Sequence, residues 1–165
     1  MREVAILLVL ALLLNGCGAS STAVQSAASG GWQAEMFGGD GTASGFSFIA
    51  QWTVTGSGGA LTVSDFQFLT QIDGGCFPVK GEVPTGTLNL VYNSADQLIP
   101  PSSFSFVVTS GGNTLTLTSL TVTGTYNSNN GTFSTLLITG TWALTGGTGC
   151  NGSNGTFNMT QTASG

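Results

Sequence analysis

The body of the chain alternates apolar and polar side chains with a period of two. In residues 44–55 the even positions from Phe46 onward are apolar, and most odd positions carry hydroxyl or amide groups. Residues 102–109 and 132–144 repeat this alternation. Because successive side chains of a strand point to opposite faces of a sheet, each segment has one apolar face and one hydroxyl-rich face. The pattern therefore predicts β-strands, and threonine on the polar face favours them further.

Turn sequences such as Asn130-Gly131 separate the alternating segments and are typical of hairpins. We expect about eight to ten strands, near residues 31–37, 44–55, 59–69, 76–83, 86–92, 102–109, 113–126, 131–145 and 155–162. Consecutive hairpins of this number favour an all-β, antiparallel up-and-down β-barrel, because closure leaves no exposed edge strand. A two-sheet β-sandwich is the alternative.

Two segments change the parity of their apolar positions midway. The change falls between Val63 and Phe66 and again between Leu117 and Leu120. One extra residue at each change would keep both halves of the strand facing inward, which is the signature of a β-bulge. The expected bulges lie near Ser64-Asp65 and Thr118-Ser119.

The first seventeen residues carry an export signal. An apolar run over residues 4–14 follows Arg2, and it is shorter than the ~20 residues that a membrane-spanning helix needs. Its length suits the apolar region of a secretory signal peptide. The run ends in Leu14-Asn15-Gly16-Cys17, which resembles the lipobox of bacterial lipoproteins. The resemblance implies cleavage before Cys17 and attachment of a diacylglycerol, with fatty acids such as palmitate, to its thiol. An ordinary signal peptide is the alternative.

This signal divides the chain into three parts. Residues 1–16 are the expected signal peptide, residues 17–30 the lipidated cysteine and a flexible tether, and residues 31–165 a single β domain. The tether is expected because its residues are small and mostly polar, and such a chain spans roughly 20 Å. Two acyl chains would anchor it stably, with the outer membrane as the expected location in a cell that has two membranes.

Cys76 and Cys150 remain as one pair once Cys17 is acylated. An oxidising compartment outside the cytoplasm would join them as a disulfide, which closes a loop worth about 4 kcal/mol in the chain-entropy model. A metal site is the alternative, although neither cysteine has a CxxC partner or a histidine.

Charge excludes several classes of function. Charged residues make up 5% of the chain, histidine is absent, and Lys80 is the one cation left after export. Binding to nucleic acid through phosphate and histidine-based catalysis are therefore not expected. The carboxylates form no close pair in sequence, and Asp65 is the one beside an expected bulge. We expect no cofactor, no metal and no enzymatic activity; a carboxylate-dependent hydrolase is the alternative.

Several features together resemble the small Thr/Gly-rich lipoproteins of acidobacteria. They are the lipobox, the small-residue segment, Gly75-Cys76-Phe77, and Cys150 shortly before Asn154-Gly-Thr-Phe157. Residues 138–142 also resemble the opening strand of avidin-type barrels. The resemblance implies a location in the cell envelope and a β fold. It does not imply a specific activity.

The expected function is that of a membrane-anchored, non-enzymatic binding or structural module of the cell envelope. One alternative is a calycin-like carrier of a small apolar ligand, with Trp52, Tyr126 and Trp142 lining its cavity. Another is a transmembrane β-barrel. The membrane, reached through the N-terminal lipid, is the expected partner, and nucleic acid is not.

Overall fold

The structure is a computed structural model of the 165-residue chain. It describes residues 21–38, 45–55, 60–70, 82–93, 95, 97–99, 102–147 and 152–164. The expected signal peptide and Cys17, Cys76 and Cys150 lie outside these residues. Lipidation and the disulfide therefore stay predictions.

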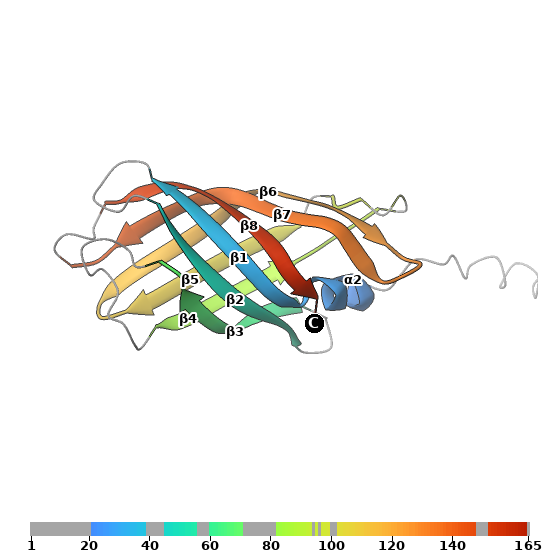
Figure 1. The fold of residues 1–165 in the computed structure, drawn as a ribbon, viewed down its shortest axis with the longest axis horizontal. Helices are drawn as coiled ribbons and strands as arrows, with labels where there is room; N and C mark the ends of the chain where they lie inside the picture. The colour runs from blue at the N-terminus through green and yellow to red at the C-terminus, as the bar shows by residue number, and fades with distance from the viewer. Residues whose placement is uncertain are drawn as a thin grey trace, which may run out of the picture.

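Eight antiparallel strands close into one barrel (Figure 1). Each strand pairs with the next along the chain, and the last pairs with the first. This confirms the up-and-down barrel, and the β-sandwich alternative is wrong. The strands are β1 (Gly30–Gly38), β2 (Phe46–Thr55), β3 (Ala60–Phe68), β4 (Val83–Asn89), β5 (Ser103–Ser110), β6 (Asn113–Asn127), β7 (Thr132–Thr145) and β8 (Asn154–Ser164).

The apolar face of every strand lines the inside of the barrel. In β2, Phe46, Phe48, Ala50 and Trp52 are buried, while the residues between them are exposed or half-buried. Burial of each large apolar side chain contributes about 1.5–3 kcal/mol, so the period-two pattern fixes which face turns inward. The outer face is consequently rich in threonine, serine and amide side chains.

Both expected bulges are present. Gln51 pairs with Asp65, but the next residue, Trp52, pairs with Val63, which leaves Ser64 as the extra residue of β3. In β6 the register shifts between Ser119 and Thr121. The parity changes in the sequence are thus confirmed as bulges.

Leu120 corrects one detail of that prediction. The parity argument placed its side chain inside the barrel, but the side chain is 70% exposed. Leu120 is itself the extra residue of the β6 bulge, so it leaves the alternation and turns outward.

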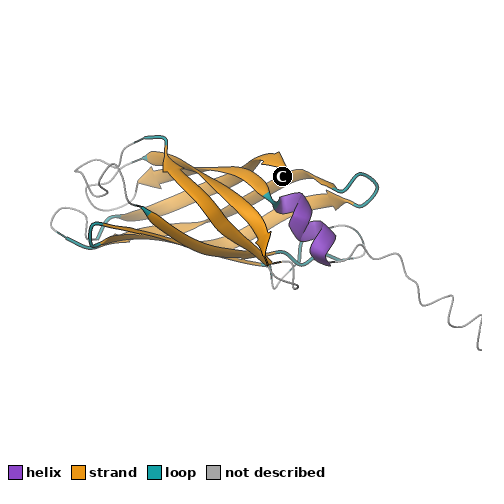
Figure 2. Ribbon diagram, turned by 90° about the horizontal axis from the view of Figure 1, so that it is seen from below, coloured by secondary structure: helices purple, strands orange, loops and turns teal. Residues whose placement is uncertain are grey.

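A second correction concerns the predicted tether. Residues 21–28 form helix α2 (Ser21–Ala28), which lies across one end of the barrel (Figure 2). Val24, Ala27 and Ala28 are buried, at helical spacing. A helix of eight residues is marginal by itself, so packing against the barrel end stabilises it. The folded unit therefore begins before residue 31.

Side chains from the barrel also bind the carboxyl end of α2. Trp32 Nε1 donates to Ala28 O at 2.9 Å. Gln161 Nε2 donates to Ala27 O at 2.8 Å and to Ser29 O at 2.9 Å. The last carbonyl groups of a helix have no partner within the helix, and these donors satisfy them.

The connection between β4 and β5 folds over the same end of the barrel. Leu98 N donates to Gly124 O at 3.3 Å, and Gln97 forms a bridge with Thr125 of β6. Gln25 of α2 is held at the start of this connection, where its Nε2 donates to Leu90 O at 3.0 Å. The helix and the connection together cover the end at which β1 begins.

Replacement of Leu117 and Leu120 tests the position of the β6 bulge. We expect Leu117→Ala to lower the free energy of unfolding by about 2–5 kcal/mol, because it opens a cavity in the barrel. Leu120→Ala should change it by less than about 0.5 kcal/mol, because the side chain faces solvent. Urea denaturation measures both, and comparable losses would show that the bulge is misplaced.

The docking of α2 is tested by Gln161→Leu. The change keeps the volume but leaves the carbonyls of Ala27 and Ser29 without their donor, so we expect a loss of about 1–3 kcal/mol. Faster hydrogen exchange of the α2 amides should accompany it. Gln33→Leu, on the outer wall of β1, is the matched control, and equal effects on α2 from both variants would contradict the assignment.

Candidate functional site

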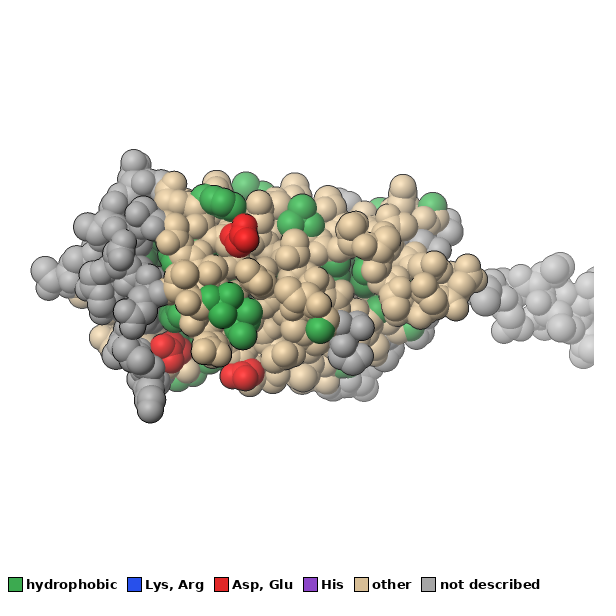
Figure 3. All heavy atoms as spheres, in the orientation of Figure 1, with side chains coloured by type: hydrophobic (Ala, Val, Ile, Leu, Met, Phe, Trp, Pro, Cys, Tyr) green, Lys and Arg blue, Asp and Glu red, His purple; other side chains and the backbone are tan. Residues whose placement is uncertain are grey.

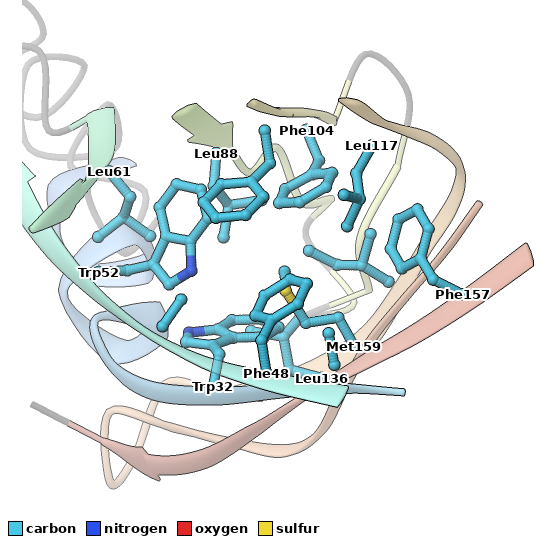
Figure 4. Close-up of a cluster of buried hydrophobic side chains, with 14 of the residues drawn as sticks. Trp32, Phe48, Trp52, Leu61, Leu88, Phe104, Leu117, Leu136, Phe157 and Met159 are labelled. Atoms are coloured by element: carbon cyan, nitrogen blue, oxygen red, sulfur yellow. The ribbon is translucent and has the colours of Figure 1, made fainter. Parts of the chain in front are cut away.

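The three aromatic residues predicted to line a cavity all lie inside the barrel. Trp52, Tyr126 and Trp142 are 1%, 3% and 1% exposed. Trp52 packs against Phe104 and Phe106, with ring centroids 5.7 Å and 5.9 Å away. In Figure 4, side chains from different strands, among them Trp52, Phe104 and Phe157, point into the interior of the barrel.

Trp142 and Tyr126 pack with other partners than Trp52 does. Trp142 lies edge-on to Phe46 at 5.2 Å, and its Nε1 donates to Phe37 O at 3.0 Å. The Tyr126 ring lies 5.7 Å from Tyr92 and 5.4 Å from Phe133. These contacts are those of a packed core, so the three residues do not converge on one ligand position.

Two buried polar atoms of the described residues make no hydrogen bond. They are Trp52 Nε1, a donor, and Gln25 Oε1, an acceptor. A buried polar group without a partner costs about 1–3 kcal/mol. Among the described residues, Trp52 Nε1 is thus one of two buried polar atoms that the packing leaves unexplained.

A shallow depression of about 140 Å³ lies on the outer wall, across β8, β1, β2 and β3. The outward-facing side chains around it are mostly polar. Its lining consists of Gly31, Trp32, Ile49, Ala50, Gln51, Asp65, Phe66, Gln67 and Thr162. The volume is on the scale of a small ligand, since an enclosed cavity of about 150 Å³ accepts benzene.

Strand register explains why the wall is hollow at this point. Gly31 pairs with Gln51 on one side and with Ala163 on the other. The pairing with β8 shifts between Gly31 and Trp32, and Thr162 is the extra residue. A Cβ on Gly31 would lie 3.1 Å from Thr162 Oγ1, a tight contact, so the bulge brings the Thr162 side chain close against the Gly31 backbone.

The lining combines one carboxylate with neutral donors and acceptors. Asp65 Oδ1 accepts a hydrogen bond from Phe66 N at 2.8 Å, which fixes the carboxylate beside the bulge. Gln51 and Gln67 supply exposed amides, and Ile49, 37% exposed, supplies an apolar surface. Such a set can bind a ligand that carries hydroxyl or ammonium groups next to a carbon skeleton.

The chemistry at this site is limited by its single acid. Glycoside hydrolysis usually employs two carboxylates, and Asp65 is the one acidic residue among those named as lining the depression. Within the described ranges, no group of three or more His, Cys, Asp or Glu residues comes together as metal ligands do. The same ranges contain no helix with the length and hydropathy that a membrane crossing requires.

Sequence reasoning identified one residue of the depression. Asp65 was predicted to lie beside a bulge, and it does. Gly31, Gln51 and Thr162 were not singled out, because only the register of four strands brings them together. The parity signal that revealed the bulge in β3 is weak in β8, where the bulge lies near the end of the strand.

Comparison of the chain with protein-family models, with curated proteins and with solved structures gives no match.

Replacement of Trp142 and Trp52 by phenylalanine tests the packed interior. Both changes remove similar volume, but Trp142→Phe also deprives Phe37 O of its donor. We expect Trp142→Phe to cost about 1 kcal/mol more than Trp52→Phe in urea denaturation. The reverse order would indicate that Trp52 Nε1 has a hydrogen-bond partner in solution.

Proposed function

We propose that the protein is a lipid-anchored, non-enzymatic module of the cell envelope that binds a small polar ligand on the outer wall of its barrel. The observation that carries the proposal is the filled interior. Eight strands leave an interior just wide enough for side chains, and here Trp32, Trp52 and Phe106 are among those that occupy it. Because side chains occupy the interior, we assign ligand binding to the outer wall.

The polarity of the outer wall supports a barrel that faces water. Thr116 and Thr118 of β6 pair with Ala143 and Thr141 of β7. A transmembrane barrel instead carries an apolar band about 25 Å tall on its outer face. The scattered exposed apolar residues on this wall, such as Leu120 and Ile49, do not form such a band.

The anchor rests on the lipobox-like sequence at Leu14–Cys17. Acylation there would place the barrel at the membrane without any need for its strands to enter the bilayer. A polar outer wall and an N-terminal lipid are compatible, because the lipid attaches the barrel to the membrane while the wall stays in contact with water.

A carrier of a small apolar ligand is the second candidate, and one observation favours it. Trp52 Nε1 is a buried donor without a partner, and a ligand with a carbonyl group would satisfy it. Such a ligand would have to displace aromatic side chains that already pack together.

A nuclear magnetic resonance titration separates the two candidates. The probes are glucosamine, whose hydroxyl and ammonium groups suit the depression, and N-phenylnaphthylamine, which is apolar. We expect glucosamine to shift the amide resonances of Gly31, Gln51 and Gln67, with an affinity in the millimolar range typical of small ligands. Shifts confined to interior residues, produced by the apolar probe alone, would favour the carrier and contradict the proposal.

Matched variants identify the contribution of charge. Asp65→Asn removes the negative charge while Oδ1 can still accept from Phe66 N, so we expect glucosamine to bind about fivefold or more weakly. Glu35→Gln removes a carboxylate elsewhere on the wall and should leave the affinity unchanged. Equal effects of the two variants would show that binding follows net charge rather than the site.

A further inference from the structure

We propose that the end of the barrel covered by α2 lies against the lipid headgroups, with the opposite end pointing away from the membrane. The inference rests on the proposed acylation of Cys17. It follows from the attachment of α2 to the barrel end, from the length of the barrel, and from the distribution of charge.

Helix α2 is held firmly against the barrel end. Val24 and Ala28 are fully buried, and three hydrogen bonds from Trp32 and Gln161 hold the carboxyl end of the helix. Residues 18–20 alone therefore separate Cys17 from the folded unit. A fully extended chain gains at most about 3.6 Å per residue, so the barrel end lies within roughly 14 Å of the acylated cysteine.

The length of the barrel prevents the opposite end from taking this position. β6 has 15 residues, which extend about 50 Å along the strand and roughly 38 Å along a barrel axis inclined by ~40°. α2 lies where β1 begins and β8 ends, and the Gly111-Gly112 turn lies at the other end (Figure 1). The anchor cannot span that distance.

Charge agrees with this orientation. Glu82 precedes β4 at the end away from α2, and Glu35 pairs with Ser47 in the half of β1 nearer that end. On the visible face in Figure 3 the acidic side chains all lie in the half away from α2. The turn 128–131 on the α2 side is Ser-Asn-Asn-Gly and carries no charge.

Three large exposed apolar side chains lie at the same end as these carboxylates. Phe37, Leu69 and Val83 are 45%, 48% and 57% exposed, and all three lie at the strand ends remote from α2. In the proposed orientation these residues point away from the membrane. The α2 end thus contacts lipid through polar groups, while the anchor supplies the apolar attachment.

Paramagnetic relaxation measures the orientation in the full, acylated protein. The protein is purified from its membrane and placed in nanodiscs of phosphatidylethanolamine and phosphatidylglycerol that contain a gadolinium-chelate lipid. We expect the Asn129 and Gly131 amides to broaden at least fivefold more than those of Gly112 and Gly147. Equal broadening at both ends, or stronger broadening at Gly112, would overturn the proposal.

Two insertions serve as variant and matched control. Twelve Gly/Ser residues inserted between residues 20 and 21 should reduce the contrast between the ends, because the anchor is no longer short. The same insertion between Gly111 and Gly112 should leave the contrast intact. An unchanged contrast in the first variant would mean that something other than the short anchor sets the orientation.

Failure of the proposed anchor gives a different result. Without acylation, mass spectrometry would find no acyl group on Cys17 and the protein would not bind the nanodiscs. That outcome overturns the anchor and the orientation together, whereas an acylated protein without end-to-end contrast overturns the orientation alone.

Discussion

The pairing of β1 with β8 is the constraint on which the rest of the structure depends. It converts a row of hairpins into a closed wall, so that neither β1 nor β8 leaves a free edge of unpaired backbone groups. Closure also separates the two faces of every strand, with aromatic and aliphatic side chains inside and hydroxyl groups outside. A protein with 5% charged residues can therefore remain compact and hydrated.

The same closure determines where function is located. The wall surrounds a core that side chains occupy, so the binding that we propose is assigned to irregular places: the two bulges beside Gly31 and the end covered by α2. At the bulges the loss of regular pairing creates a hollow with one carboxylate. At the barrel end, hydrogen bonds from Gln161 to the carbonyl groups of Ala27 and Ser29 hold the short helix α2 in place.

The sequence predicts the barrel well because its signal is local. Alternation in residues 44–55 and the parity change after Val63 each follow from the flip of side chains along a single strand. The outward direction of the Leu120 side chain was not predicted, because the parity change locates a bulge without showing which residue leaves the alternation. Helix α2 and the depression could not be predicted, since small residues acquire helical structure only against the barrel end and Gly31 meets Gln51 only through strand register.

Hydrogen exchange of the β1 amides tests closure most directly. In a closed barrel both edges of β1 are paired, so successive amides are bonded alternately to β2 and β8. The account predicts slow exchange at every residue from Trp32 to Met36. Fast exchange at alternate residues of this stretch would show that β1 is an edge strand, and it would contradict the barrel and the arguments that depend on it.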